Sequence, residues 1–357
     1  MKFKLEDICS LRKEKISIEK LTIETYISTE NMLPNKAGIV NASALPTIRS
    51  IQAYEKGDIL ISNIRPYFKK IWKAKINGGC SNDILVFKTK KNTDKDFLYY
   101  ILADDAFFIY AMATSKGTKM PRGDKISIMQ YEVPYFDVKI QKKIASILKS
   151  IDEKIEIYKQ INNNLEQQAH ALYCKFLSDK IINGVFKDIV IENKKSKIKV
   201  SEAQDINGEY PFFTSGKRIL EYNSYLVDNR NIYLNTGGNA DVKYYIGKAS
   251  YSTDTWCITT KNNLTNYCYL FLKNIQNEID AIYFEGSALK HLQKKKLLEK
   301  KIYIPNIQET QNLNEILDPL FEIISKNTFQ NRYLSFLRDA LLSKLMSGEF
   351  DISEIDI

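Results

Sequence analysis

The chain has 357 residues, 44% of them apolar and 27% charged, and a formal net charge of +9. This length allows two domains with cores of their own, and the positive charge favours an anionic partner such as nucleic acid. Five cysteines without a Cys-x-x-Cys pair and two histidines argue against a disulfide framework or a zinc site. The N-terminus lacks the apolar run of a signal peptide and the apolar segments are too short to cross a bilayer, so we expect a cytoplasmic protein without a membrane partner.

Residues 1–136 have the pattern of a mixed α/β domain. Residues 57–62 and 83–88 are apolar and β-branched, which predicts two strands. Thr93 and Asp94 are expected to cap a helix that runs from about Lys95 to Met112. A loop rich in Gly, Lys and Thr follows at residues 114–125 and leads to a polar segment that ends at Pro134.

A long helix is predicted at residues 137–180. Its seam positions, spaced alternately by four and three residues, are Ile140, Ile144, Ile147, Ile151, Lys154, Tyr158, Ile161, Leu165, Gln168, Leu172 and Lys175. The periodic stretch from about Lys139 to Leu177 spans roughly 55 Å at 1.5 Å per residue and needs a partner along its length. The polar seam positions Lys154 and Gln168 either fix the register of the pair or are tolerated imperfections.

A second mixed α/β domain is predicted at residues 181–305. Residues 183–184 and 194–197 have the composition of a linker, and strands are expected at 231–235, 244–246 and 251–260. A second long helix is predicted at residues 306–350, with a bend or a fresh segment at Pro319 and an end at Gly348. Its seam positions are Leu313, Leu317, Leu320, Ile324, Asn327, Asn331, Leu334, Arg338, Leu341 and Leu345.

The two halves of the chain repeat each other at a distance of about 170 residues. Residues 117–154 match residues 286–324, since each stretch passes from a glycine through basic residues to a proline and then into a helix. Two long seams on one chain bury their apolar side chains most simply against each other. We therefore expect an α+β fold in which two mixed α/β domains are joined by two long helices that pack as an antiparallel coiled coil.

Motifs for catalysis are missing from the sequence. It contains neither a phosphate-binding loop nor the glycine spacing of a dinucleotide site, and two histidines make a catalytic triad or a hydrolytic zinc site improbable. Asp83 and Asp254 occupy matched repeat positions, where a carboxylate usually bonds a turn or caps a helix. We expect no catalytic residue, no metal and no cofactor.

Basic loops occur at the same place in both repeats, which favours binding of a phosphate polymer. In the first domain the candidate DNA contacts are Arg65, Tyr67, Lys69, Lys70, Lys116, Lys119 and Arg122. In the second domain they are Lys217, Arg218, Lys290 and His291, together with Asn235, Asn239 and Lys243 around the turn at residues 237–238. For any one of these side chains taken alone, a solvated surface group is the favoured interpretation.

An ordered set of stretches resembles the specificity (S) subunit of type I restriction-modification systems. The set consists of residues 57–62 with Arg65-Pro66, residues 132–134 leading into 141–148, and residues 151–155, 164–169 and 337–349. The resemblance covers nearly the whole chain and is strongest in the helical regions. It implies two target recognition domains, each reading one half of a split DNA site.

The resemblance also implies partners. The long helices would pair antiparallel, set the gap between the half-sites and dock two copies of an adenine methyltransferase subunit, and a restriction subunit would join the assembly. S-adenosylmethionine, ATP and magnesium are then expected only on the partner subunits. The rival from another class is a coiled-coil scaffold whose basic modules bind protein or RNA. A nuclease or methyltransferase fragment is a weaker rival, because its motifs are missing.

Overall fold

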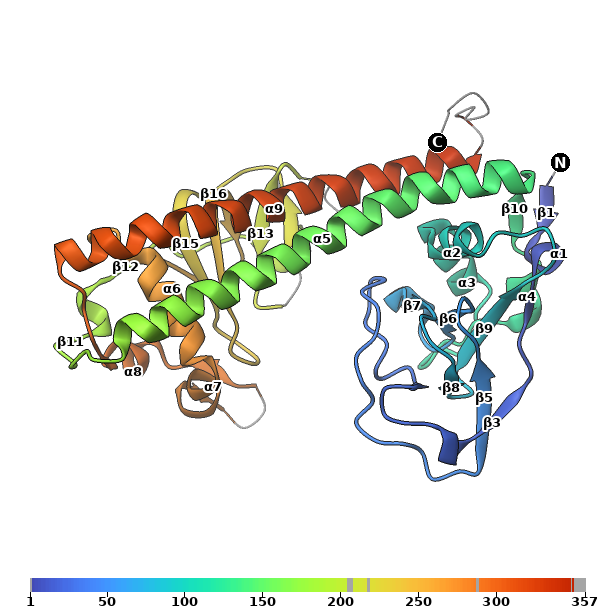
Figure 1. Ribbon diagram of the computed structural model, residues 1–357, viewed down its shortest axis with the longest axis horizontal. Coiled ribbons are helices and arrows are strands. Elements are labelled where there is room, and N and C mark those ends of the chain that lie inside the picture. The colour runs from blue at the N-terminus through green and yellow to red at the C-terminus, as the bar shows by residue number, and fades with distance from the viewer. Residues whose placement is uncertain (1, 204–207, 217–218, 287–288, 348, 350–357) are drawn as a thin grey trace. The chain divides into compact units, whose positions relative to one another are not determined.

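The computed structural model of the chain describes residues 2–203, 208–216, 219–286, 289–347 and Glu349. The chain divides into two compact units, unit 1 (Met1–Ile155 and Arg332–Ile357) and unit 2 (Glu156–Asn331). Their boundaries fall inside two long helices, α5 (Val138–Leu177) and α9 (Ile307–Ser347), so each unit contains a part of each helix (Figure 1). The expected domain limits at residues 136, 180 and 305 stay predictions.

A four-stranded antiparallel sheet lies at the centre of unit 1. Its strands in spatial order are β2 (Cys9–Leu11), β9 (Ile84–Thr89), β6 (Ile59–Ser62) and β7 (Ile71–Lys73). The second sheet has the order β3 (Lys15–Ser17), β5 (Ser50–Tyr54), β8 (Gly78–Cys80) and β4 (Tyr26–Ile27), and β1 (Lys2–Lys4) pairs with β10 (Glu132–Pro134). The helices are α1 (Leu5–Ile8), α2 (Lys95–Ala103), α3 (Asp105–Ala113) and α4 (Lys125–Met129), with the 3-10 turns η1 (Ile18–Lys20) and η2 (Pro66–Phe68).

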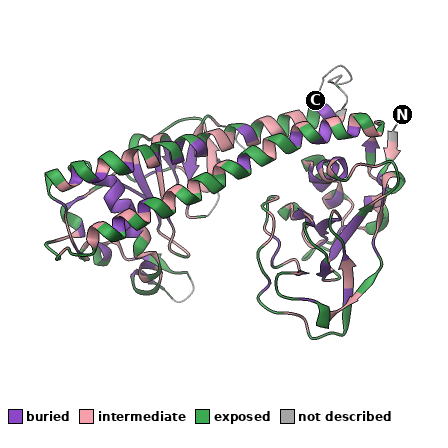
Figure 2. Ribbon diagram, in the orientation of Figure 1, coloured by how far each residue is buried: buried purple, intermediate pink, exposed green. Residues whose placement is uncertain are grey.

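Both faces of the central sheet of unit 1 are covered. Ile59 and Ile61 of β6 join a core formed with α2, α3 and the ends of the long helices, whereas Leu60 joins a core shared with the second sheet. All four residues of β6 are buried (Figure 2). Burial on both faces explains why this strand is an unbroken apolar run in the sequence.

Unit 2 is built on a six-stranded sheet. Its strands in spatial order are β12 (Val190–Glu192), β17 (Thr255–Thr260), β15 (Val227–Asn235), β16 (Val242–Tyr251), β13 (Tyr210–Phe213) and β14 (Leu220–Tyr222). Two further pairs join β11 (Gly184–Val185) to β20 (Lys301–Ile302) and β18 (Phe284–Glu285) to β19 (His291–Leu292). The helices are α6 (Thr265–Asn274), α7 (Gln276–Glu278) and α8 (Lys294–Leu298), with the short turns η3 (Phe186–Asp188), η4 (Val200–Glu202) and η5 (Ile279–Tyr283).

The two units repeat one arrangement, which confirms the internal repeat and the α+β class. The strand order β2-β9-β6-β7 of unit 1 recurs in unit 2 as β12-β17-β15-β16, with antiparallel neighbours throughout. A helix follows the second strand of this order in both units, α2 after β9 and α6 after β17. In each unit, a short helix and a short strand then lead into a long helix.

Within each unit, α5 and α9 run antiparallel. In unit 2, the Asn327 amide donates to Asn162 Oδ1 at 2.9 Å and Lys180 Nζ pairs with Glu309 at 2.9 Å. In unit 1, the Arg338 guanidinium contacts the Asp152 carboxylate at 2.8 Å. Later residues of α5 thus meet earlier residues of α9, as an antiparallel pair requires.

The expected seam is correct for α9 and partly wrong for α5. The α9 seam positions are buried or half-buried from Leu313 to Leu345. In α5, the expected positions Lys154 and Gln168 are exposed, whereas Ile155 and Ala169, one residue further on, are 6% and 0% exposed. The reason is that α5 packs both against α9 and against the mixed α/β part of each unit, so its buried face is wider than a two-helix seam.

Two expected helices differ from the structure at a single residue each. The helix expected at 95–112 is broken at Asp104, which has extended backbone angles and accepts the Ala106 N–H at 3.0 Å as the cap of α3. Helix α9 continues through Pro319, so the expectation of a fresh segment there is wrong. Pro319 is exposed between the buried Leu317 and Phe321, whose packing maintains the helix. Gly348 lies outside the described residues.

The expected linker is also wrong, because its residues belong to unit 2. Gly184 pairs with Ile302 in the β11–β20 ladder, and Asn183 bonds Ile304 through its side chain. In the basic stretch at 194–197, the Lys194 carbonyl accepts the Tyr251 hydroxyl and Ser196 is buried. Residues 183–184 and 194–197 have the polar composition of a linker, but hydrogen bonds fix them to the rest of unit 2.

Candidate nucleic-acid interface

Three loops of unit 1 meet where β6 ends and β9 begins. The Asn63 N–H donates to the Asp83 carbonyl at 2.7 Å, which joins the two strand ends. The Arg65 N–H donates to the Pro121 carbonyl at 2.9 Å and so brings in the loop at residues 115–124. We call residues 63–69, Asp83 and residues 115–124 the loop cluster of unit 1.

Main-chain bonds also close the basic loop of this cluster. The N–H of Lys116 donates to the Arg122 carbonyl and the N–H of Arg122 to the Lys116 carbonyl, each at 2.9 Å. Residues 117–121 form the tip between them, and the side chain of Lys119 in this tip is exposed. Gly123 lets the loop approach β6, because a Cβ there would lie 2.7 Å from Asn63 Oδ1. A charged tip is thus held on a fixed base.

Some of the predicted cations in unit 1 already have partners. Lys116 Nζ contacts Asp124, and Lys69 Nζ contacts Asp105 at 2.8 Å. The bonds from Lys116 and from the Ser127 N–H lower the pKa of Asp124 to about 2. Lys70 donates to the Thr29 carbonyl, and partial burial lowers its pKa.

Other predicted groups of unit 1 remain available for an outside partner. Arg122 Nη2 lies 3.1 Å from Asp83 Oδ1, while its side chain is 59% exposed. The Tyr67 side chain is 48% exposed beside Phe68. Within the described residues, neither Arg65 nor Lys119 has a side-chain partner. The structure therefore brings Arg65, Tyr67, Lys119 and Arg122 to one loop cluster, where Arg122 pairs with Asp83 but keeps most of its side chain exposed.

Unit 2 has an equivalent meeting of loops. The Thr236 N–H donates to the Asp254 carbonyl at 3.1 Å, and the Gly238 N–H donates to the Lys290 carbonyl at 3.1 Å. The Ser215 hydroxyl also donates to the Asp254 carbonyl. We call residues 214–216, residues 236–239, Asp254 and residues 289–291 the loop cluster of unit 2.

Two predicted base contacts of unit 2 make hydrogen bonds within their own loops. Asn235 is 5% exposed, and its amide nitrogen donates to the carbonyls of Ser215 at 2.6 Å and Asn239 at 3.1 Å. Lys243 Nζ bonds Asn235 Oδ1 and the Thr214 carbonyl, both at 3.1 Å, and pairs with Asp241 at 2.9 Å. As placed, both side chains use their polar groups inside unit 2.

Three other predicted residues of unit 2 lie on its surface. Asn239, Lys290 and His291 are exposed, and the main chain of His291 bridges to Gly237. Lys217 and Arg218 lie outside the described residues. The two loop clusters are therefore comparable position by position, since the bridges Ile64 to Arg122 and Gly237 to His291 correspond.

Sequence reasoning missed Asn63 and Thr236, whose N–H groups make the equivalent bonds to Asp83 and Asp254. The spacing between these two residues departs slightly from that of the helical repeat, so alignment at a fixed distance does not pair them. The signal that finds them is structural, namely that each follows the end of the matching strand. The main-chain carbonyls of Asp83 and Asp254 accept these bonds, and the Asp83 carboxylate contacts Arg122.

Comparison with known proteins gives the chain a family. The type I restriction modification DNA specificity domain matches residues 1–167 and residues 182–332. The chain belongs to this family. It is a specificity subunit, the non-catalytic DNA-recognition component of a type I restriction-modification system.

Individual relatives agree with this assignment. The specificity subunit is 24% identical over 352 residues to the type I restriction enzyme MjaIX specificity subunit of Methanocaldococcus jannaschii, covering 86% of this chain and 80% of that protein. It is 32% identical over 165 residues to the HindI specificity subunit of Haemophilus influenzae, covering 43% of this chain and 35% of that protein. The crystal structure of the type I restriction-modification S subunit from M. genitalium has the same fold, with a TM-score of 0.58 and 18% identity over 99% of this chain and 96% of that one.

Neither a group of metal-ligating side chains nor a membrane-spanning helix occurs in the described part of the specificity subunit. There, no three His, Cys, Asp or Glu side chains come together as metal ligands. No described helix combines the length and apolar character needed to span a membrane.

Proposed function

We propose that each unit of this specificity subunit reads one half of a bipartite double-stranded DNA target. The observation that carries the proposal is the pair of loop clusters, built on the same main-chain bonds but bearing different side chains. Sequence is read through side chains that reach base edges, whereas phosphate contacts position the protein. The two loop clusters share the same main-chain frame, meaning the hydrogen bonds that join their loops, but carry different side chains. This combination suits two different half-sites.

The proposed contacts follow from the placement of the side chains. In unit 1 they are Arg65, Tyr67, Lys119 and Arg122, with Lys69, Lys70 and Lys116 adding positive charge from paired positions. In unit 2 they are Asn239, Lys290 and His291, with Lys217 and Arg218 retained from the sequence. We assign Asn235 and Lys243 the part of holding the loops that carry these contacts, because their polar groups are bonded internally.

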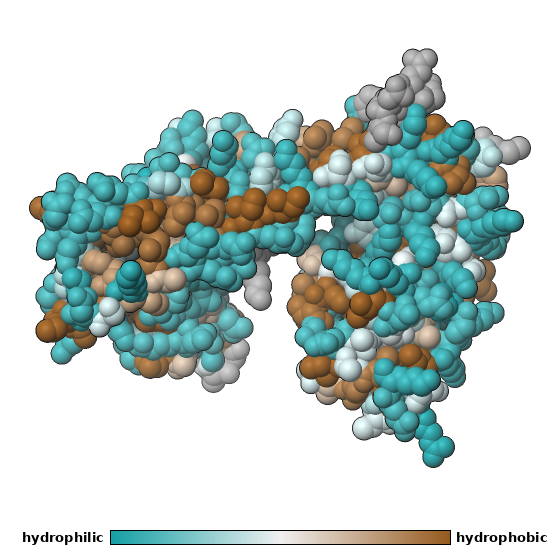
Figure 3. Space-filling view, in the orientation of Figure 1, coloured by the Kyte–Doolittle hydropathy of each residue, from teal (hydrophilic) through white to brown (hydrophobic). Residues whose placement is uncertain are grey.

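The long helices are proposed to set the gap between the half-sites and to dock two methyltransferase subunits. Apolar side chains lie along α9 in unit 2, where Ile316, Ile323 and Phe329 are 52%, 43% and 47% exposed (Figure 3). Exposed apolar groups of this size on a helix are typical of interaction surfaces. A restriction subunit would join the same assembly, and S-adenosylmethionine, ATP and magnesium would act on the partner subunits.

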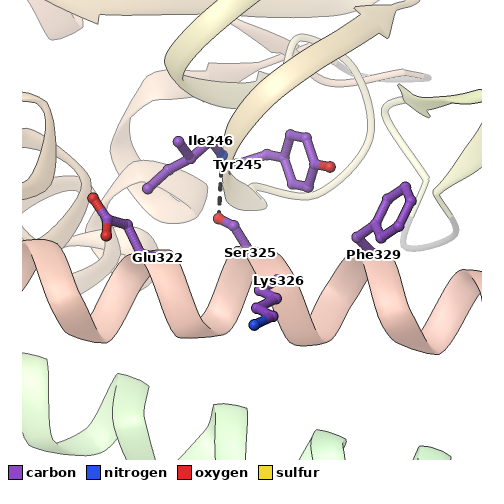
Figure 4. Close-up of a pocket in the computed structure, with 6 residues that line it drawn as sticks. All are labelled: Tyr245, Ile246, Glu322, Ser325, Lys326 and Phe329. Atoms are coloured by element: carbon purple, nitrogen blue, oxygen red, sulfur yellow. Dashed lines mark hydrogen bonds between the residues drawn. The ribbon is translucent and has the colours of Figure 1, made fainter.

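A pocket beside α9 offers a seat for a partner side chain. It is open, has a volume of about 260 Å³ and is lined by Tyr245, Ile246, Glu322, Ser325, Lys326 and Phe329 (Figure 4). The Ile246 N–H donates to Ser325 Oγ at 3.2 Å, which fixes the floor of the pocket. An aromatic wall with a charged rim is the composition of interface anchors.

Mapping of methylated adenines in the host genome tests the half-site proposal. We expect a bipartite motif with a fixed gap that disappears when the gene for this chain is deleted. One continuous short motif would contradict the proposal. An electrophoretic shift with duplex DNA, compared with RNA of equal length, separates it from the scaffold alternative, which predicts no preference for the duplex.

Co-purification with the methyltransferase subunit tests the docking proposal. Phe329→Asp places a charge in the pocket wall and should reduce recovery of the partner, whereas Ile109→Asp, at a more exposed apolar position on α3 in unit 1, should leave it unchanged. Equal recovery with both variants would remove the pocket from the docking surface.

A further inference from the structure

Arg65 has an unusual backbone conformation that its side chain does not favour. Its φ and ψ are 51° and 69°, in the left-handed region, and it directly precedes Pro66. Left-handed angles are disfavoured for residues with a Cβ, and a following proline pushes its predecessor towards extended angles. The position therefore suits glycine far better than arginine.

Unit 2 shows what the frame alone requires at this position. Gly238 makes the equivalent main-chain bond, to the Lys290 carbonyl, as Arg65 does to the Pro121 carbonyl. Its φ of 82° is likewise left-handed, and a Cβ built there has no neighbour within 4 Å. Glycine thus fits this frame without strain, and unit 1 has an arginine in its place.

The arginine has no structural task in unit 1 that would explain its presence. Among the described residues, the other left-handed residues that are neither Gly nor Asn are Lys36 and Lys69, and each contacts Asp105 at 2.8 Å. Arg65 has no side-chain partner in the part of the chain that the structure describes, so its guanidinium offers all its N–H donors there. Backbone strain that no stabilising side-chain contact offsets points to a functional role for the residue.

We propose that Arg65 is a phosphate anchor that gives unit 1 a backbone contact with DNA for which unit 2 has no counterpart at Gly238. This inference rests on the proposed DNA-binding function. A guanidinium fork matches the geometry of a phosphate and binds it in two parallel hydrogen bonds. Arg65 is half-buried at the base of the cluster, whereas Arg122 is 59% exposed, so Arg122 is the better placed to enter a groove and Arg65 to meet the backbone at its rim.

The test uses Arg65→Gly in the full-length chain. Because glycine relieves the left-handed strain, the variant should unfold at the same or a higher temperature than the wild type, so weaker binding is not a folding defect. Binding to a mixed-sequence duplex is measured from 50 to 200 mM salt. Loss of one phosphate contact should lower the slope of log K against log salt by about one, so that the wild type loses affinity about threefold more over this range than the variant.

Three comparisons make the result specific. Arg65→Lys keeps a charge that binds phosphate as a point and should retain the slope of the wild type. Arg49→Ala removes an exposed arginine of unit 1 from outside the loop cluster and should leave the slope unchanged. Gly238→Ala should lower the unfolding temperature, because it adds a Cβ at left-handed angles.

Methylation mapping in the host with each variant completes the test. The anchor predicts an unchanged bipartite motif for Arg65→Gly, with lower occupancy at every site. Loss of base preference at one motif position would overturn it in favour of base reading, and an unchanged salt slope would overturn it outright. Absence of DNA binding by the wild type would instead contradict the proposed function.

Discussion

A polar pair with one buried and one half-buried partner lies within the helix seam of unit 2, and replacing it by leucine should stabilise the chain only when both partners are changed. Asn327 is 7% exposed and donates to Asn162 Oδ1 at 2.9 Å, while the Asn162 amide lies 3.3 Å from the Ile324 carbonyl. The proposed variants are Asn162→Leu, Asn327→Leu and the double substitution.

The expected magnitudes follow from burial and from unmet hydrogen bonds. Each leucine gains about 1.5–3 kcal/mol if it becomes fully buried. Each single change leaves the other amide without its partner, at a cost of about 1–3 kcal/mol. The single variants should therefore lie near the wild type, whereas the double variant should be about 2–4 kcal/mol more stable because no orphaned amide remains.

Urea unfolding of the full-length chain, followed by helix content, measures the complete double-mutant cycle. We expect a coupling free energy of about 2–4 kcal/mol between the two sites, since the single changes are near zero and the double change is not. Leucine at both sites should also loosen the register of the pair, since a polar layer in a seam specifies alignment. Additivity of the single changes within about 0.5 kcal/mol would refute the reasoning, because it would show that the two amides do not depend on each other.

Four further outcomes follow from the structure and from the proposed function. Alanine at both Lys119 and Arg122 should weaken DNA binding and lower its salt slope by about two, and an unaltered slope would remove them from the contacts. Deletion of one heptad from α5, about 10 Å of helix, should change the gap of the methylated motif or abolish methylation, whereas an unchanged gap would refute a spacing role for the helix. Arg12→Ala should destabilise unit 1 by about 3–5 kcal/mol in urea unfolding, because it leaves Asp58 as an unpaired buried charge, and a loss below 1 kcal/mol would contradict this. Bonds from Tyr303, the Asn306 N–H and Lys180 lower the pKa of Glu309 to about 2. Its contribution to stability is therefore present above its ordinary pKa near 4.5 and is lost as the pH falls towards 2. Melting curves from pH 6 to pH 2 should show a smaller fall in the melting temperature for Glu309→Gln than for the wild type.

The long helices were predictable because their pattern repeats over many turns, so a single irregular position does not disturb it. The buried positions of α5 were less predictable. A heptad pattern assumes one partner helix, whereas α5 packs both against α9 and against the mixed α/β part of each unit. Asp104 shows a different limit. Its side chain satisfies the first turn of α3, and this local bond outweighs the apolar continuity that predicted one helix.

The candidate interface was predictable in place but not in detail. The basic loops appear in the sequence because charge and glycine are local signals, and the repeat doubles them. Burial is not local. Asn235 and Lys243 have the composition of base contacts, yet their neighbours Ser215, Asn239 and Thr214 enclose them, and no spacing in the sequence reveals that contact.

The bonds that define the two loop clusters explain how the frame can persist while the side chains change. Asn63 to Asp83 and Thr236 to Asp254 are bonds between main-chain N–H and carbonyl groups, as are Arg65 to Pro121 and Gly238 to Lys290. Every amino acid except proline supplies these N–H groups, and every amino acid supplies the carbonyls, so these bonds do not depend on which side chains the loops carry. Side chains at its surface are then free to differ, as Arg122 in unit 1 and His291 in unit 2 do at one equivalent bridge. A frame held by main chain and a surface made of side chains is the division of labour that a protein needs in order to acquire new half-sites without refolding.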